Sequence, residues 1–191
     1  MTRAPESSTR TVRIVHLDAA TLAALADGDL ARAVATSPVD LTEWLAGPEC
    51  VGTWRRRARQ VVETPGDAPW VTGVLWDEHE QRAVGKAGFH AAPDTGGLVE
   101  VGYAVDPAYR RRGYARAALE TMIARAQADP DVRTLRATVS PANTASLRLI
   151  GQYPFVETGE QWDEEDGPEI IFELAVGQRC GNASPPPAAS A

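Results

Sequence analysis

The pattern of hydrophobic and polar positions divides the 191-residue chain into a helix-rich first part and a strand-rich second part. Val12, Ile14 and Leu17 alternate with other residues and predict a short strand, after which Asp18 can cap a helix. From residue 70 onward, short apolar runs separated by turn residues predict strands. The expected elements, in chain order, are a strand at 12–17, a helix at 18–26, a broken helical segment at 29–47, a helix at 52–63, strands at 70–77, 82–91 and 98–105, a helix at 113–128, a strand at 133–139, a helix at 143–152, and strands at 155–160 and 169–176.

This order of elements indicates one mixed α/β domain. A strand, helices, an antiparallel meander and then alternating helices and strands require one central crossover connection. A chain of this length can bury a core without disulfide bonds. We expect the domain to span residues 11–176, between a flexible N-terminus at 1–10 and a disordered tail at 177–191 that is rich in Pro, Ala and Ser.

The charge balance narrows the classes of partner. The net charge is -7 and the sequence pI is about 5.0. Such a surface repels the phosphates of a nucleic acid and attracts a cationic substrate. No apolar run approaches the length of about 18 residues that a membrane helix needs, and the first ten residues hold no secretory signal. We therefore expect a cytoplasmic monomer or homodimer with no membrane partner, and no metal, because Cys50 and Cys180 belong to no ligand-spaced cluster.

The most informative segment runs from the predicted strand at 98–105 into the helix that follows it. Arg110, Arg111 and Arg112 precede Gly113, which opens that helix. A glycine lets a ligand approach the backbone closely, and the first N–H groups of a helix have no partner inside it. Such a helix start, with arginines beside it, is typical of a diphosphate site. An isolated run of arginines would more often be a solvated face, but the glycine and the flanking elements favour the anion site.

The spacing Arg110-x-x-Gly113-x-Ala115 resembles the Arg/Gln-x-x-Gly-x-Gly/Ala signature of the GNAT acetyltransferase superfamily. Upstream, the sequence Glu-Val-Gly-Tyr-Ala-Val at 100–105 is similar to the fourth strand of that family. Downstream, Ser-Pro-Ala-Asn-Thr-Ala-Ser at 140–146 is similar to its second coenzyme-binding segment. Within the family, the chain most resembles the branch that acetylates ribosomal-protein N-termini and includes many small-molecule acetyltransferases.

The resemblance covers residues 70–175 and implies a fold, a co-substrate and a set of binding residues. It implies a mixed, mostly antiparallel sheet of about seven strands, flanked by helices and splayed beside the fourth strand. It also implies acetyl-coenzyme A as co-substrate. By this resemblance, the residues expected to contact the coenzyme are Tyr103, Ala104, Val105, Arg110, Arg111, Arg112, Gly113, Tyr114, Ala115, Arg116, Asn143 and Ser146. Asn143 also fits the N-cap position of the following helix, and the two roles are compatible.

Acetyl transfer to nitrogen needs a neutral amine, whereas an alkylammonium has a pKa of about 10. A general base must therefore take a proton, and the resemblance points to Glu100, which alternatively is a structural carboxylate. At the position where many family members have a tyrosine that protonates the departing thiolate, this chain has Ile150. Tyr153 is the substitute that we expect, with Tyr103 as an alternative. A thiolate with a pKa near 8.5 can also leave without an acid.

The acceptor amine is expected between the early helices and a loop at 160–169. The acidic residues of that loop attract a cation, or the loop is simply solvated. Trp44 and Trp54 can line a pocket, although tryptophans at helical positions more often belong to a core. The three histidines are scattered along the chain and are expected to be structural: His16, His79 and His90.

The sequence thus predicts an N-acetyltransferase that carries the acetyl group of acetyl-coenzyme A to a primary amine of a small molecule or a protein N-terminus. Two alternatives remain open. One is transfer of a longer acyl group, and the other is a non-catalytic module that binds acyl-coenzyme A.

Overall fold

The computed structural model describes residues 10–164 and 167–176. The predicted disordered tail and all of the predicted flexible N-terminus except Arg10 lie outside the described residues. No described helix is both long enough and apolar enough to cross a membrane.

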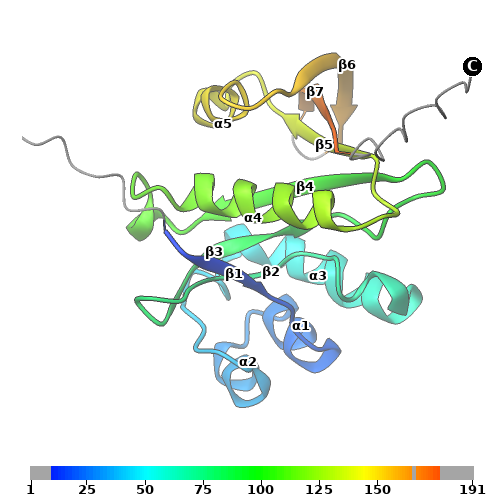
Figure 1. The fold of residues 1–191 in the computed structure, drawn as a ribbon. Coiled ribbons are helices and arrows are strands. Elements are labelled where there is room, and N and C mark those ends of the chain that lie inside the picture. Colours follow the sequence, from blue (N-terminus) through cyan, green and yellow to red (C-terminus); the bar gives the residue numbers. More distant parts are fainter. Residues whose placement is uncertain (1–9, 165–166, 177–191) are drawn as a thin grey trace, which may run out of the picture.

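A seven-stranded sheet in the order β1-β2-β3-β4-β5-β7-β6 forms the centre of the molecule (Figure 1). Neighbouring strands are antiparallel except for β4 and β5, which are parallel. The strands are β1 (Val12–Val15), β2 (Gly73–Asp77), β3 (Arg82–Phe89), β4 (Leu98–Val105), β5 (Thr134–Val139), β6 (Val156–Asp163) and β7 (Gly167–Ala175). The predicted mixed, mostly antiparallel sheet of about seven strands is therefore confirmed.

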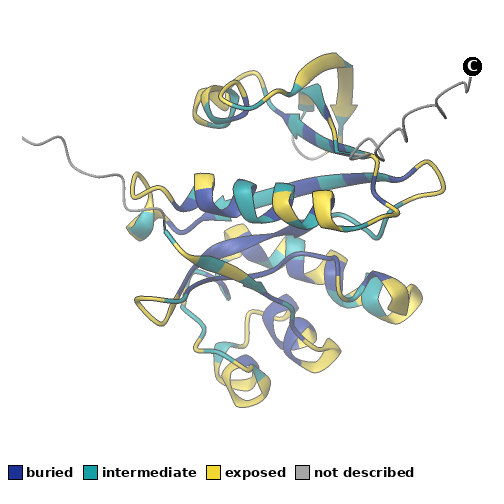
Figure 2. Cartoon of the chain, in the orientation of Figure 1, coloured by how far each residue is buried: buried dark blue, intermediate teal, exposed yellow. Residues whose placement is uncertain are grey.

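Helices cover both faces of the sheet. In the described part of the chain they are α1 (Ala19–Ala26), α2 (Leu30–Thr36), α3 (Pro48–Glu63), α4 (Tyr114–Ala128) and α5 (Thr144–Ile150), with short 3-10 turns η1 (Pro65–Asp67) and η2 (Pro107–Tyr109). On one face, Leu22 and Leu25 of α1 and Trp54 of α3 pack against Val74 and Trp76 of β2. On the other face, α4 forms the parallel crossover from β4 to β5 and packs its apolar side on the sheet. Figure 2 shows that the central strands are buried between these two helical layers.

The sheet opens along the line between β4 and β5. These strands pair from Leu98 opposite Thr134 to Val101 opposite Ala137 and no further. Beyond that point β4 continues beside β3 as far as Val105, while β5 continues beside β7. The predicted splay beside the fourth strand is confirmed. It divides the sheet into a four-stranded body, β1 to β4, and a three-stranded C-terminal part, β5 to β7, that carries α5.

The structure differs from the sequence prediction at the start of α3 and at residues 160–169. Helix α3 begins at Pro48, four residues before the predicted start, and proline is favourable in a first helical turn, where its missing N–H costs nothing. In the described residues of the predicted acidic loop at 160–169, β6 and β7 instead pair as strands, with Glu160 opposite Ile170 and Gln161 opposite Glu169. Strand β6 is exposed along most of its length, so its sequence lacks the alternation of apolar and polar residues that marks a half-buried strand.

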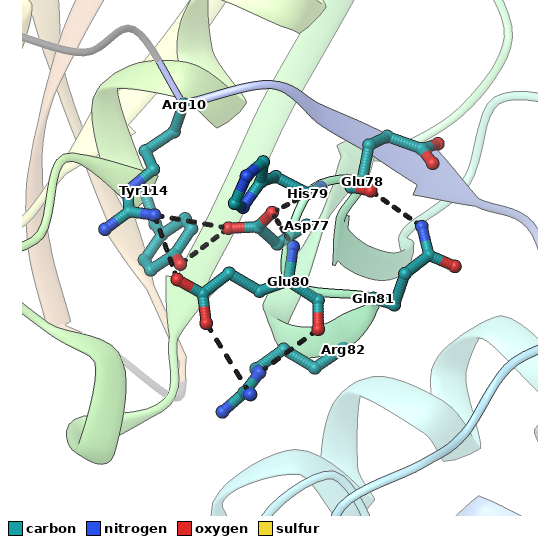
Figure 3. Close-up of polar contacts among 8 residues, drawn as sticks. All are labelled: Arg10, Asp77, Glu78, His79, Glu80, Gln81, Arg82 and Tyr114. Carbon is teal, nitrogen blue, oxygen red and sulfur yellow. Dashed lines mark hydrogen bonds and ion pairs between the residues drawn. The ribbon is translucent and has the colours of Figure 1, made fainter.

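A buried carboxylate joins the turn between β2 and β3 to the start of α4 (Figure 3). Asp77 accepts hydrogen bonds from the hydroxyl of Tyr114 at 2.7 Å and from the backbone N–H groups of His79 and Glu80, both at 2.8 Å. The guanidinium of Arg10 lies 3.8 Å from the same carboxylate and over the ring of Tyr114. Burial alone would raise the pKa of Asp77, but these donors and Arg10 together hold it below its usual range. The carboxylate is therefore charged at neutral pH, and it fixes the first turn of α4 to the body of the sheet.

This contact generates a prediction about stability. Replacing Tyr114→Phe removes one of the donors to a buried carboxylate, which should lower the free energy of unfolding by about 1–3 kcal/mol. Chemical denaturation at neutral pH measures the change. The matched control is Tyr109→Phe, because the ring of Tyr109 is only half-buried, and its effect should stay within about 0.5 kcal/mol. Equal effects of the two substitutions would show that the hydrogen bond to Asp77 does not contribute measurably to the free energy of unfolding.

Candidate active site

Two cavities meet where β4 and β5 part. One has a volume of about 450 Å³ and lies beside Glu100, His90 and the end of β5. The other has a volume of about 580 Å³ and lies between the end of β4 and the start of α4. Both are lined by Tyr103, Asn143 and Ser146, so they form one continuous cleft through the opening of the sheet.

The second cavity brings together most of the residues that the sequence predicts for coenzyme binding. Arg112 and Arg116 do not line it. The predicted residues that do line it are Tyr103, Ala104, Val105, Arg110, Arg111, Gly113, Tyr114, Ala115, Asn143 and Ser146. Residues that are up to 43 positions apart in the sequence, from Tyr103 to Ser146, thus converge on one cavity because β4, α4 and α5 all border the opening.

The start of α4 borders the second cavity and, like the start of α3, has a glycine N-cap and no side-chain cap. Its N-cap is Gly113, with φ at 88° and no side chain to accept a hydrogen bond from the first turn. In contrast, Asp18, Asp29 and Asn143 cap α1, α2 and α5 with side-chain oxygens. A Cβ atom added to Gly113 would have no atom within 4 Å, so this position faces open space. The uncapped N–H groups and the positive end of the helix dipole therefore face the cavity and suit a diphosphate.

The loop before α4 is held in a specific conformation. Asp106 accepts a hydrogen bond from the backbone N–H of Ala108 at 2.9 Å, and the Nε of Arg110 donates to the carbonyl of Val105 at 3.1 Å. Arg111 has φ at 62°, in the left-handed region that a non-glycine residue rarely adopts. That conformation costs about 1–2 kcal/mol, and the bonds around it maintain it. The loop is therefore preformed rather than waiting for a ligand to shape it.

The two predicted arginines outside the cavity contact other parts of the protein. The guanidinium of Arg112 lies over the ring of Tyr109, at 5.5 Å from its centre. Arg116 donates to the hydroxyl of Tyr153 at 3.3 Å and to the side-chain oxygen of Gln152. Both side chains are exposed beside the cleft, so their predicted contact with the coenzyme stays a prediction.

On the first cavity, Glu100 and His90 form a cross-strand pair. His90 follows β3 directly and donates its backbone N–H to the carbonyl of Glu100 at 2.8 Å. Its Nδ1 lies 3.4 Å from Oε1 of Glu100, and the same oxygen accepts a hydrogen bond from the hydroxyl of Thr138 at 2.8 Å. The sequence predicts a role for Glu100 and treats His90 as structural, whereas the structure places both side chains in the wall of one cavity. No sequence signal identified His90, because its partner is set by the register of β3 against β4.

The rest of the first cavity is mixed in charge. Burial lowers the pKa of His90 from its usual value, with Arg57 and Arg56 adding to this effect, while Glu100 and Asp163 oppose it. The imidazole is therefore neutral at neutral pH. The side chains of Arg56, Asp163 and Glu169 complete the wall. Two of the predicted acidic residues of 160–169 thus reach the cavity, from strands rather than from a loop.

The two candidate tyrosines differ in position. Tyr103 borders both cavities, and its hydroxyl is buried without a hydrogen bond of good geometry. Burial raises the pKa of Tyr103, although Ser146 is near enough to oppose the rise. Tyr153 lines neither cavity, and its hydroxyl donates to the carboxylate of Glu120 at 2.7 Å. The structure therefore favours Tyr103 over Tyr153 as a proton donor inside the cleft.

The remaining sequence predictions concern Asn143 and the tryptophans. The side chain of Asn143 accepts a hydrogen bond from the backbone N–H of Ser146 at 3.1 Å, so it is an N-cap, and it also lines both cavities. Trp54 is fully buried and donates to the carbonyl of Leu45 at 2.6 Å, which makes it a core residue. Neither Trp44 nor Trp54 lines the first cavity.

Comparison with known proteins agrees with this geometry. Residues 10–156 match the family model of the acetyltransferase (GNAT) domain. The chain is a member of the GNAT acetyltransferase family. The ribosomal-protein-S5-alanine acetyltransferase of Vibrio fischeri has a similar fold, with a TM-score of 0.58 at 19% identity over 88% of this chain and 93% of that one. A chimera of the spermidine N-acetyltransferase SpeG from Vibrio cholerae and hSSAT gives a TM-score of 0.61 at 14% identity, over 88% and 96% of the two chains.

Two curated relatives match this GNAT protein in sequence. The L-2,4-diaminobutyric acid acetyltransferase of Streptomyces anulatus is 44% identical over 82 residues, which is 37% of this chain and 47% of that protein. The N-acetyltransferase YjdG of Bacillus subtilis (strain 168) is 30% identical over 93 residues, or 49% of this chain and 54% of that protein. The chain thus spans about half the length of the curated relatives that it matches.

The uncapped start of α4 generates a prediction about coenzyme binding. Gly113→Ala places a methyl group into the cavity and strains the backbone, because φ at this position is positive. We expect the affinity for acetyl-coenzyme A to fall at least about tenfold, which corresponds to about 1.4 kcal/mol, as measured by calorimetric titration. Gly28→Ala is the matched control, since Gly28 has a similar φ of 73° and lies outside the cleft. If both variants bind the coenzyme like the wild type, the cavity at α4 is not the coenzyme site.

Proposed function

We propose that this GNAT protein transfers the acetyl group of acetyl-coenzyme A to a primary amine, by direct attack of the amine on the thioester while both substrates are bound. The observation that carries the proposal is the opening between β4 and β5, which joins an anion-accepting cavity to a carboxylate-bearing one. A reaction between two bound substrates needs such a continuous passage, because the reacting atoms must approach within about 3–3.5 Å.

The coenzyme side of the proposal rests on the residues around Gly113. The first N–H groups of α4, with Arg110 and Arg111 beside them, would hold the diphosphate. The edge of β4 from Tyr103 to Val105, which pairs with no strand on the side facing β5, would bind the pantetheine arm through its backbone groups. This arrangement directs the thioester toward the point where the two cavities meet.

The acceptor side rests on charge. Glu100, Asp163 and Glu169 give the first cavity three carboxylates against the one guanidinium of Arg56, and the excess of negative charge attracts an ammonium group. Removal of a proton from that ammonium, which depends on Glu100, frees the lone pair that attacks the thioester carbonyl. As the new C–N bond forms, the C–S bond breaks. One proton of the original ammonium reaches solvent and a second protonates the departing thiolate.

The relatives support an amine as acceptor and suggest which amines to test. The names of two of them refer to acetylation of a diamino acid and of spermidine, and a third refers to an alanine of a ribosomal protein. The acceptor that we propose is therefore a primary amine, either on a cationic small molecule or at a protein N-terminus.

The proposal predicts amine-dependent turnover. With acetyl-coenzyme A and a panel of polyamines, diamino acids and short peptides, the wild type should release free thiol only when a suitable amine is present. Glu100→Gln should lower kcat by about 10²–10⁴ and change the affinity for acetyl-coenzyme A by less than about twofold. Glu63→Gln is the matched control, because Glu63 is exposed at the end of α3.

Other outcomes have distinct meanings. Binding of acetyl-coenzyme A without turnover on any amine would favour a non-catalytic binding module. Faster turnover with a longer acyl-coenzyme A would change the transferred group but not the mechanism. If Glu100→Gln lowers the melting temperature, coenzyme affinity and rate together, Glu100 is a structural carboxylate.

Substitution of Tyr103 or of Tyr153 should affect kcat differently, because only one of them is expected to protonate the departing thiolate. We propose that the second proton of the original ammonium passes through Tyr103, which gives its own proton to the thiolate and takes up the one that the nitrogen releases. Tyr103 borders both cavities, and its raised pKa keeps it protonated at neutral pH. Tyr103→Phe should lower kcat by about 10²-fold with little change in KM for the amine. Tyr153→Phe should lower it less than about threefold, since that hydroxyl is bonded to Glu120. A larger loss for Tyr153→Phe would return the role to the residue that the sequence favours.

A further inference from the structure

His90 and Glu100 share one face of the sheet at the place where it opens. The register of β3 against β4 pairs Phe89 with Val101, and His90 continues it so that it lies opposite Glu100. Residues opposite each other in antiparallel strands point to the same face. Both side chains line the cavity that we assign to the acceptor amine, and 3.4 Å separates Nδ1 of His90 from Oε1 of Glu100.

The absence of a side chain at Gly102 leaves space for the imidazole. A Cβ atom built on Gly102 would lie 2.9 Å from Nε2 of His90, which is closer than real Cβ contacts allow. Gly102 lies immediately after Val101, the last residue of β4 that pairs with β5, at the point where the two strands separate. The second nitrogen of the ring is therefore held over the first open position of the strand, while its Nδ1 faces the carboxylate.

The backbone of His90 is fixed by buried polar groups from α3 and η1. Arg57 and Gln60 both donate to the carbonyl of His90, each at 2.8 Å. Gln60 also donates to Asp67 at 2.6 Å, and the other oxygen of Asp67 accepts from the backbone N–H of Ala92 at 3.0 Å. Both Arg57 and Asp67 are buried. Three side chains thus hold the segment that carries the imidazole, so its position is not that of a loose loop residue.

The charged groups around His90 set which form of the imidazole is present. Although the side chain of His90 is 42% exposed, desolvation of the ring by the surrounding protein lowers its pKa most, and Arg57 and Arg56 of α3 lower it further. Glu100 of β4 and Asp163 of β6 act in the opposite direction, and the result stays below the usual value of 6.5. At neutral pH the ring is therefore neutral. The carboxylate beside Nδ1 favours the tautomer with the proton on Nδ1, which leaves a lone pair on Nε2.

We propose that His90 is the general base of this site: its Nε2 takes the proton from the acceptor ammonium, and Glu100 acts as a positioning residue that orients the ring and stabilises the imidazolium. The proposal rests on the proposed function and specifies how Glu100 exerts its effect there. One proton passes from the ammonium nitrogen to Nε2, the amine keeps the electron pair with which it attacks, and the imidazolium later gives this proton to solvent. A carboxylate behind an imidazole is a known way of fixing its tautomer and raising its basicity.

The first test replaces the base while keeping the size of the side chain. His90→Gln should lower kcat by about 10²–10⁴, while the affinity for acetyl-coenzyme A and the melting temperature stay close to those of the wild type. His79→Gln is the matched control, because His79 is exposed in the turn between β2 and β3 (Figure 3) and should behave like the wild type. The double variant His90→Gln with Glu100→Gln should lose little more than the worse single variant, since the two residues act as a unit.

The pH dependence of kcat/KM for the amine separates the two possible bases. The wild type should show an acid limb below pH 6.5, where His90 becomes protonated. Glu100→Gln removes a charge that raises the pKa of His90, so the limb should move to lower pH but persist. His90→Gln should lose the limb, and its rate should climb with the neutral fraction of the amine up to a pKa of about 10. If instead the limb persists in His90→Gln and disappears in Glu100→Gln, Glu100 is the base and the proposal is wrong.

A third variant avoids changing either titrating group. Gly102→Ala should displace the ring of His90 and lower kcat, and NMR titration of the His90 ring should show a shifted pKa when its distance from Glu100 changes. If His90→Gln does not fold, this variant decides: wild-type kcat in Gly102→Ala together with an altered His90 titration would overturn the proposal. Failure of the proposed function looks different, because the wild type itself would then release no thiol with any amine.

Discussion

The arrangement of the cleft depends on one interruption of backbone hydrogen bonding, between β4 and β5. β4 and β5 pair over only four residues of each strand, from Leu98 to Val101 and from Thr134 to Ala137. Buried backbone groups without a partner are costly, so strands that part inside a sheet need some other partner for the groups they leave open. In the function that we propose, an extended ligand along Tyr103 to Val105 is that partner. The same interruption creates the passage between the two faces, and therefore makes binding and reaction possible at one place.

The polar networks on each face hold this opening in shape. On the coenzyme face, Asp77 ties the first turn of α4 to the body through Tyr114. On the acceptor face, Arg57 and Gln60 hold the carbonyl of His90. Neither network touches the point where the strands part, yet each fixes an element that borders it. Preformed sites of this kind reduce the ordering cost that a ligand would otherwise have to offset.

The proposed anion site was easier to predict from the sequence than the proposed acceptor site, for a physical reason. The residues around Gly113 are neighbours in the chain, so their pattern shows in the sequence as a strand, a basic loop and a helix start. The acceptor cavity is assembled from β3, β4, β5 and the β6–β7 hairpin, and its composition depends on strand register. Glu100 was predicted because it resembles a family position. His90 and Gly102 were missed because no local pattern reveals which residues face each other across two strands.

The placement of Arg56 and Arg57 near His90 explains why a histidine suits this cavity. A base works best when its pKa lies near the pH at which it operates, and the ammonium it must deprotonate has a pKa of about 10. An imidazole is closer to that range than a carboxylate in water, but only its neutral form can accept a proton. Beside acidic residues alone, His90 would become protonated and would repel an incoming ammonium. The arginines and the burial of the ring counteract this tendency. With His90 as the proposed base, the cavity can therefore attract a cation through its carboxylates and still keep that base unprotonated.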